Sequence, residues 1–242
     1  MTVQATFAAT VVDEWVRGGV TDAVLAPGSR STPLALALVA RADVRVHVHL
    51  DERSASFYAL GLGIATGRPA VVLTTSGTAA VELHPAVVEA HHAHVPLLAC
   101  TADRPPELHD VGAPQAIDQV HLFGRAVRWF AQPGVPDDAA RGTWRSLAAR
   151  AVVEAAGASG APGPVHLNLA FRDPLVGEPG PLPVGRPGGA SWHGAVEVRP
   201  EPVDLDLGSL ADAVTGRSGV IVAGGGIADP DGVHQHDAGH RP

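Results

Sequence analysis

Hydrophobic and polar residues follow two spacings along this chain, one typical of buried strands and the other typical of amphipathic helices. Short apolar runs predict strands at residues 22–27, 44–50, 69–76, 96–102 and 164–170. Helical spacing predicts helices at residues 6–19, 31–40, from Glu52 onward, 78–94 and 137–156. Strands that alternate with helices predict an α/β fold, a parallel sheet with helices on both faces, over about residues 1–173.

The segment VRVHVHL at residues 44–50 alternates strictly between apolar and polar residues. Val44, Val46, Val48 and Leu50 are therefore expected on one face of a strand, with Arg45, His47 and His49 on the other. The strand ends on an acidic pair, Asp51 and Glu52, and a helix rich in Gly and Ala follows at once. A carboxylate at such a junction is either a helix cap or a catalytic acid, and the pattern alone leaves both open.

The pattern changes after residue 173. Residues 174–203 are rich in Pro and Gly and predict an extended linker. Residues 204–228 contain a helical run, LGSLADAV, and a strand-like run, SGVIVAGGGI, which predict the truncated start of a second α/β domain. Residues 229–242 have no apolar period and are interpreted as a tail that is foreign to the fold.

Composition narrows the possible classes of protein. The formal net charge of -8 argues against nucleic acid or an anionic membrane as the main partner. The single cysteine excludes an internal disulfide framework and fits a reducing compartment. We find no secretory signal and no apolar run near the ~18 residues of a membrane span, so a cytoplasmic protein is expected. The chain has no lysine, which removes Schiff-base chemistry on a lysine amine.

Polar residues gather where four predicted strands end. These ends read PGSR at 27–30, DER at 51–53, TSGT at 75–78 and ADRP at 102–105. In an open parallel sheet, ligands bind outside the carboxyl ends of the strands. Gly28 and Gly77 remove side chains where a ligand would approach the backbone. Each loop alone has the composition of an ordinary turn, but four such loops at one edge of the sheet predict a ligand site.

Five segments carry a resemblance to a known family: VLAPGSRSTPLALAL, HLDERSASFYALGLG, TTSGTAAVELHPAVVEA, PLLACTADRPPEL and GAPQAIDQVHLFG. Together they resemble the N-terminal part of the 2-succinyl-5-enolpyruvyl-6-hydroxy-3-cyclohexene-1-carboxylate synthases (MenD), thiamine-diphosphate enzymes of menaquinone synthesis. The resemblance covers about residues 8–175, and PGSRSTPL together with DERSA is specific to this family. It implies that residues 1–173 form the domain that binds the pyrimidine ring of thiamine diphosphate.

The resemblance assigns roles to the cofactor residues. Glu52 matches the glutamate that hydrogen-bonds a ring nitrogen of the cofactor's aminopyrimidine, and it is the expected catalytic residue. To hand over a proton near neutral pH such a carboxyl must exchange it readily, and burial in an apolar wall would raise its pKa. Ser76, Gly77 and Thr78 match the loop that lies against the pyrimidine, although a tight turn that caps the next helix would read the same way.

The resemblance also assigns a substrate pocket. Ser29, Arg30, Arg104 and Gln115 match positions that line the isochorismate site. Isochorismate carries two carboxylates, and guanidinium groups bind carboxylates through paired hydrogen bonds. A surface ion pair is the alternative for Arg30 and Arg104.

The family reaction implied is decarboxylation of 2-oxoglutarate on thiamine diphosphate, followed by 1,4-addition to isochorismate. Mg²⁺ would be held by a C-terminal domain that nothing in this sequence matches, so no residue here is assigned to a metal. The division of the cofactor site also implies a homodimer or a dimer of dimers. We therefore expect this chain to be an incomplete copy that is inactive alone. The alternatives are another thiamine-diphosphate lyase of the acetolactate synthase type, and a non-catalytic binding module.

Overall fold

The structure is a computed structural model that describes residues 1–194 and 208–218. The chain divides into two units, Met1–Val196 and Glu197–Pro242, which are described separately. In the second unit, the predicted helical run forms helix α7 (Gly208–Val214). The predicted strand at 218–227 lies, apart from its first residue, outside the described residues, as does the predicted tail at 229–242. The predicted division of the chain at residues 173, 203 and 228 therefore stays a prediction.

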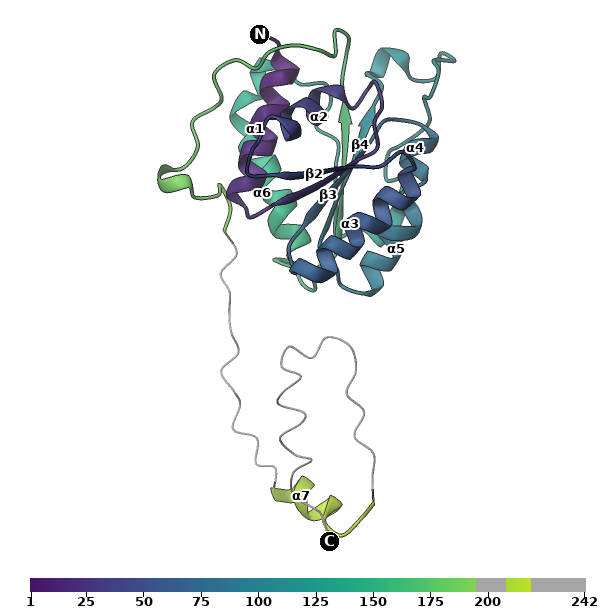
Figure 1. The fold of residues 1–242 in the computed structure, drawn as a ribbon, viewed down its shortest axis with the longest axis vertical. Coiled ribbons are helices and arrows are strands. Elements are labelled where there is room, and N and C mark those ends of the chain that lie inside the picture. Colours follow the sequence, from purple (N-terminus) through teal and green to yellow (C-terminus); the bar gives the residue numbers. More distant parts are fainter. Residues whose placement is uncertain (195–207, 219–242) are drawn as a thin grey trace. The chain divides into compact units, whose positions relative to one another are not determined.

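A six-stranded sheet forms the centre of the first unit (Figure 1). Its strands are β1 (Asp22–Leu25), β2 (Arg45–Val48), β3 (Ala70–Thr74), β4 (Leu97–Asp103), β5 (Trp129–Ala131) and β6 (Pro164–Ala170). They lie in the order β2-β1-β3-β4-β6-β5, and every neighbouring pair is parallel. The predicted parallel α/β fold is confirmed. The edge strand β5 was not predicted, because three half-buried residues are too short to show a period.

Helices cover both faces of the sheet. Helices α1 (Val3–Arg17), α2 (Thr32–Val39) and α6 (Trp144–Ala155) pack on one face, while α3 (Glu52–Thr66), the short α4 (Thr78–Val81) and α5 (His84–His92) lie on the other (Figure 1). Alternate strand residues serve the two cores: Leu73 packs with the first group of helices and Val72 with the second. Because both faces are covered, these strands read as continuous apolar runs.

The helix predicted at 78–94 is interrupted. Helix α4 ends at Val81 and α5 begins at His84, with Pro85 in its first turn. A proline ring inside a helix clashes with the carbonyl four residues earlier, which here belongs to Val81. The helix predicted at 137–156 likewise starts as a 3-10 turn, Asp138–Thr143, before α6 begins at Trp144.

Only part of the apolar face predicted at residues 44–50 is buried. Val44 is buried and Val46 packs against the first core. Val48 and Leu50, however, are 62% and 93% exposed. Strand β2 is an edge strand, and the helices that cover the sheet do not reach its final residues. An alternating pattern shows which residues share a face, but it does not show that another element covers that face.

The segment predicted as a linker is held against the domain over residues 174–194. The Gly180 amide donates a hydrogen bond to Thr6 Oγ1 on α1 at 2.8 Å, and Arg145 Nε on α6 donates to the Pro183 carbonyl at 2.9 Å. The Trp192 amide donates to Glu14, a fully buried carboxylate that also accepts from Arg145 Nη1 at 2.7 Å. This extended segment therefore forms a strap across α1 and α6, which a composition rich in Pro and Gly did not indicate.

Candidate functional site

The strand order brings the predicted ligand loops together at one edge of the sheet. Strands β2, β1, β3 and β4 are consecutive neighbours, so the loops after them lie side by side at their carboxyl ends. The loops after β1 and β3 are in direct contact, because a Cβ atom on Gly28 would lie only 2.4 Å from the Cβ atom of Thr75. Only glycine permits this approach.

The loop after β3 carries the predicted cofactor residues Ser76, Gly77 and Thr78. Gly77 has φ +80°, and a Cβ atom there would lie 3.0 Å from the carbonyl oxygen of Gln115. Ser76 is fully buried, and its Oγ donates a hydrogen bond of 2.8 Å to that same carbonyl. Thr78 begins helix α4 and is exposed. The loop is thus fixed by contacts with a segment about forty residues later, which a simple capping turn would not require.

Arg104 follows β4 directly and reaches across to this loop. Its Nη1 donates to Ser76 Oγ at 2.7 Å and its Nη2 to the Pro114 carbonyl at 2.8 Å. The residue is only 9% exposed. Burial, and then the positive charge of Arg30, lower the pKa of Arg104 below its ordinary value. A buried cation destabilised in this way favours an anionic ligand, because an anion would relieve both effects.

Arg30, in the loop after β1, is 8% exposed. Its Nη1 donates to the Phe171 carbonyl at 3.0 Å and to Asp173 Oδ2 at 3.1 Å. Its buried Nε has no hydrogen-bond partner among the described residues. The contact with Asp173 is an ion pair whose carboxylate is 71% exposed, although the guanidinium itself is buried, so the substrate-binding role of Arg30 stays a prediction. Ser29, the residue before it, is exposed at the same edge.

The structure distinguishes the two acidic residues after β2 by their contacts, and it shows which of them caps the helix. Asp51 is the N-cap of α3: its carboxylate accepts a hydrogen bond from the Ser54 amide at 2.7 Å. Hydrogen bonds from the Ser54 side chain and amide lower the pKa of Asp51. Glu52 is the first residue of α3, is half-buried, and makes no hydrogen bond or ion pair within the described residues. Because Glu52 is only half-buried, the described part of this chain does not enclose it fully.

Gln115 joins the cluster through its backbone and not through its side chain. Its side chain is exposed, whereas its carbonyl accepts from Ser76 and packs against Gly77. Its φ of +55° is unusual for a residue other than glycine. Such conformations persist where surrounding contacts enforce them, and they are common at functional sites.

A buried polar network beneath these loops was missed from the sequence. It comprises Thr101, Asp103, Gln119, His166 and Asn168, all buried. His166 is kept neutral because burial and then the charge of His121 lower its pKa to about 3. A signal was present: Thr101 and Asp103 on β4, and His166 and Asn168 on β6, are polar residues two apart in otherwise apolar strands.

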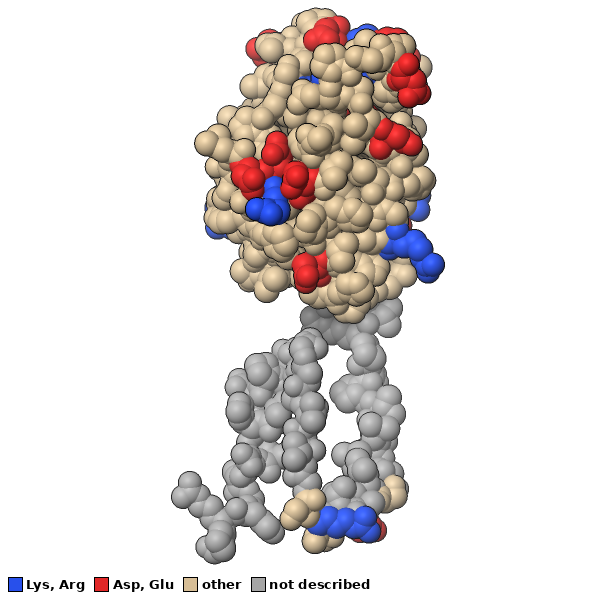
Figure 2. Space-filling model, turned by 90° about the vertical axis from the view of Figure 1, so that its right-hand side faces the viewer, with Lys and Arg blue, Asp and Glu red and all other residues tan. Residues whose placement is uncertain are grey.

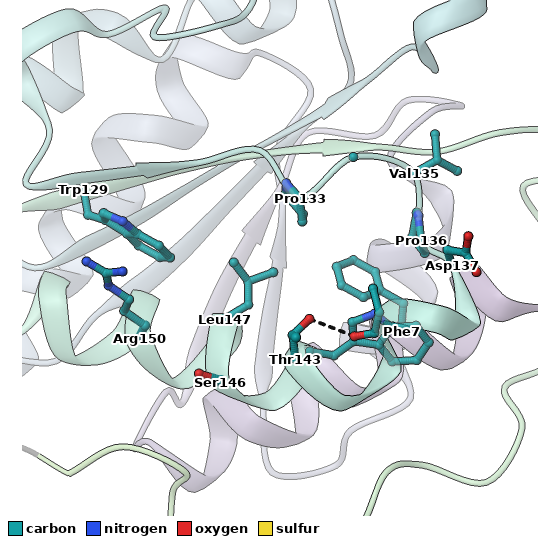
Figure 3. A pocket seen from close by; sticks show the side chains of 13 residues that line it. Phe7, Trp129, Pro133, Val135, Pro136, Asp137, Thr143, Ser146, Leu147 and Arg150 are labelled. Atoms are coloured by element: carbon teal, nitrogen blue, oxygen red, sulfur yellow. Dashed lines mark hydrogen bonds between the residues drawn. The ribbon is translucent and has the colours of Figure 1, made fainter.

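A separate cavity lies away from the ligand loops. It measures about 270 Å³, and its lining includes Phe7 of α1, Trp129 of β5 and Leu147 of α6 (Figure 3). The guanidinium of Arg150 lies over the Trp129 ring at 4.6 Å from its centre. None of the predicted site residues lines this cavity, so it is not part of the candidate site.

The described residues contain neither a cluster of metal ligands nor a membrane-spanning helix. Within residues 1–194 and 208–218, no group of three or more His, Cys, Asp or Glu side chains is placed to hold a metal ion. Among the helices of those same ranges, none combines the length and apolar character needed to cross a bilayer.

This chain is similar to known proteins in both a family match and individual sequences. Residues 5–122 match the family described as thiamine pyrophosphate enzyme, N-terminal TPP binding domain. Proteins named 2-succinyl-5-enolpyruvyl-6-hydroxy-3-cyclohexene-1-carboxylate synthase are also similar to it. The protein from Thermobifida fusca is 52% identical over 239 residues, which cover 95% of this chain and 41% of that protein. The protein from Geobacillus kaustophilus is 56% identical over 173 residues, which cover 70% of this chain and 30% of that protein.

The fold and the match over residues 5–122 define the first unit as the N-terminal cofactor-binding domain of a thiamine pyrophosphate enzyme, thiamine diphosphate being the same compound. Within that class, the chain belongs to the 2-succinyl-5-enolpyruvyl-6-hydroxy-3-cyclohexene-1-carboxylate synthases, whose N-terminal part it matches. The predicted family is confirmed. The chain spans about two fifths or less of the length of these relatives.

Proposed function

We propose that this chain supplies the aminopyrimidine side of the active site of a 2-succinyl-5-enolpyruvyl-6-hydroxy-3-cyclohexene-1-carboxylate synthase. The whole enzyme would decarboxylate 2-oxoglutarate on thiamine diphosphate and add the resulting four-carbon unit to isochorismate in a 1,4 fashion. The observation that carries the proposal is the pair of buried arginines, Arg30 and Arg104, at the carboxyl edge of a domain of this family.

The residues present fit the pyrimidine ring of the cofactor. The loop that would lie against the ring is held in one shape, because Gly77 is buried and packs directly on the Gln115 backbone. Glu52 has a carboxyl group with no partner in the described chain, so it is available to a ring nitrogen. Thiamine diphosphate, when bound, supplies the carbon centre that attacks the 2-oxo acid. Glu52 would hold and exchange the proton at the ring nitrogen, and the loop at Ser76–Thr78 would orient the ring.

Arg30 and Arg104 fit an anionic substrate. They follow strands β1 and β4, which lie on either side of β3, and the charge of Arg30 lowers the pKa of Arg104, so the pair favours a ligand with more than one carboxylate. Isochorismate has this chemistry. Ser29 is exposed beside Arg30 and would add a hydroxyl contact, and the exposed amide of Gln115 would add another.

The described residues do not fit the other end of the cofactor. We propose that another domain of the complete enzyme holds the diphosphate and Mg²⁺, since the family matched over residues 5–122 is described as an N-terminal binding domain. We therefore expect no turnover from this chain alone. We further propose a cytoplasmic location, because the single cysteine of this chain is a free thiol, as is usual in a reducing compartment.

We also propose that the complete enzyme is a homodimer or a dimer of dimers. Phe57 and Tyr58 on α3 and Val81 on α4 are each 42% exposed. Figure 2 views the side of the domain that carries α3–α5, and most of that face has neither acidic nor basic residues. An exposed apolar face next to Glu52 suits a second copy that covers it and completes the wall around the carboxyl group.

The proposal is tested with a chimeric enzyme in which residues 1–194 of this chain replace the matching part of the Thermobifida fusca protein. We expect product from 2-oxoglutarate and isochorismate that depends on thiamine diphosphate and Mg²⁺. Glu52→Gln in this chimera should lower turnover about 10²- to 10⁴-fold, because an amide cannot exchange the proton. Asp51→Asn is the matched control, since Asn caps a helix as well as Asp does.

Three results would contradict the proposed catalytic residue, substrate or cofactor. Wild-type turnover by Glu52→Gln would remove its catalytic role. A chimera that decarboxylates 2-oxoglutarate but ignores isochorismate would favour a lyase of the acetolactate synthase type. A folded chimera that does not bind thiamine diphosphate would favour a non-catalytic binding module.

A further inference from the structure

We propose that Gln119 is a positioning residue that fixes the predicted cofactor loop and couples it to the predicted substrate arginine, Arg104. The inference rests on the proposed function for what these loops bind. Its physical content, a buried amide that holds two loops in one geometry, rests on contacts within the described residues alone.

Gln119 is only 1% exposed, and both ends of its side-chain amide are used. Its Oε1 accepts a hydrogen bond of 2.8 Å from the Gly77 amide. Its Nε2 donates to Asn168 Oδ1 at 2.8 Å and to the Ala102 carbonyl at 3.2 Å. Because one end accepts and the other donates, a flipped amide would oppose all three partners, so the orientation is fixed.

The network continues from Asn168 to Arg104. Asn168 Nδ2 donates to Asp103 Oδ2 at 2.7 Å, and Asp103 Oδ1 accepts from the Arg104 amide at 2.7 Å. These contacts cross between β4 and β6, in which Thr101 pairs with Asn168 and Asp103 with Ala170. The Gly77 amide is thereby connected to the Arg104 backbone through side chains that are all buried.

A second route joins the same two loops. Arg104 Nη1 donates to Ser76 Oγ at 2.7 Å, and Ser76 is the residue before Gly77. The two routes together close a hydrogen-bonded ring through Gly77, Gln119, Asn168, Asp103, Arg104 and Ser76. In a closed ring, moving the Arg104 side chain to meet an anion displaces the loop that carries Gly77. The ring would thus let occupancy at the arginine alter the cofactor loop.

An apolar side chain of the same length would fill the space of Gln119 equally well. It could neither accept from Gly77 nor donate to Asn168, and would leave both buried groups unsatisfied. A Gln119→Met variant therefore keeps the packing of Gln119 but removes its hydrogen bonds, so it tests the positioning role alone. The ¹⁵N-labelled chain of 242 residues is compared with Gln119→Met by amide hydrogen exchange, with no cofactor or substrate present. The outcome is therefore independent of the chimera assay.

We expect exchange of the Gly77 amide to accelerate roughly 5- to 150-fold in Gln119→Met, the factor that an unmade buried hydrogen bond implies. The Val72 amide on β3 should exchange as in the wild type. Gln132→Met is the matched control: Gln132 Oε1 accepts from Asn168 Nδ2 at 3.3 Å but does not reach Gly77. It should leave Gly77 protected.

Gln119→Glu tests the two ends of the amide separately. Its carboxylate still accepts from Gly77 but cannot donate to Asn168, so Gly77 should recover protection while the Arg104 amide loses it. The proposal is wrong if Gly77 exchanges at the wild-type rate in Gln119→Met, or if Gly77 and Val72 accelerate equally, which would mean a general loss of stability. Should Gln119→Met fail to fold, wild-type exchange at Arg104 in Gln119→Glu would overturn it.

Discussion

Replacing Gly77 by alanine should destabilise this domain at least about twice as much as replacing another glycine of similar φ. Gly77 adopts φ +80° and ψ −137°, a region that other residues enter at a cost of about 1–3 kcal/mol. The new Cβ atom would also lie 3.0 Å from the Gln115 carbonyl oxygen and 3.1 Å from its Cα. Overpacking of this kind adds about 1–3 kcal/mol.

The matched control is Gly134→Ala. Gly134 has φ +81°, but a Cβ atom there meets nothing within 4 Å, so this variant carries the cost of a positive φ without the collision. With a slope of about 2 kcal/mol per M in urea, Gly77→Ala should lower the unfolding midpoint by about 1–3 M. The control should lower it by about half as much or less.

Unfolding in urea is followed by far-ultraviolet circular dichroism, which reports the helices and not the loop itself. Equal midpoints for the two alanine variants would show that Gln115 gives way freely and does not hold the loop. In that case the contact between Gly77 and Gln115 would not define the shape of the candidate site.

The remaining predictions concern the buried groups of the domain. Arg145→Met should cost about 3–5 kcal/mol in unfolding free energy, since it leaves the fully buried Glu14 unpaired; urea unfolding measures this, and a loss below about 1 kcal/mol would contradict it. Although burial acts to raise it, hydrogen bonds from Arg145 and two further arginines lower the pKa of Asp13 to about 2. The ordinary pKa of an aspartate is 3.8, so the stabilisation by Asp13 is present above pH 4 and disappears as the pH falls toward 2. The urea midpoint of Asp13→Asn should therefore fall less over that pH range than the midpoint of the wild type. Equal falls in the two midpoints would refute this. Burial raises the pKa of the Cys100 thiol, so a thiol reagent at pH 8 should label this single cysteine only after unfolding; rapid labelling of the folded chain would show otherwise.

The edge of the sheet where the candidate site lies was predictable from local patterns. Strand ends at PGSR, TSGT and ADRP are local features, and the rule that parallel strands share one carboxyl edge brings them together. The roles of Asp51 and Glu52 were not separable in this way. The cap depends on one hydrogen bond, from the Ser54 amide to Asp51. Which carboxylate accepts such a bond depends on the residue at which the helix begins, and the sequence pattern does not define that residue.

The alternation of strands and helices, and with it the parallel sheet with two covered faces, follows from patterns within short stretches of the chain. Side-chain period is a local property, because neighbours in a strand or helix are also neighbours in the chain. The polar contacts that hold the candidate site together, by contrast, become visible only in the folded domain. Gln119 meets a Gly77 amide that is 42 residues away in sequence, and Arg30 meets a carbonyl 141 residues away. A hydrogen bond needs donor and acceptor within about 3 Å, and no local pattern records a partner that folding brings in from so far along the chain.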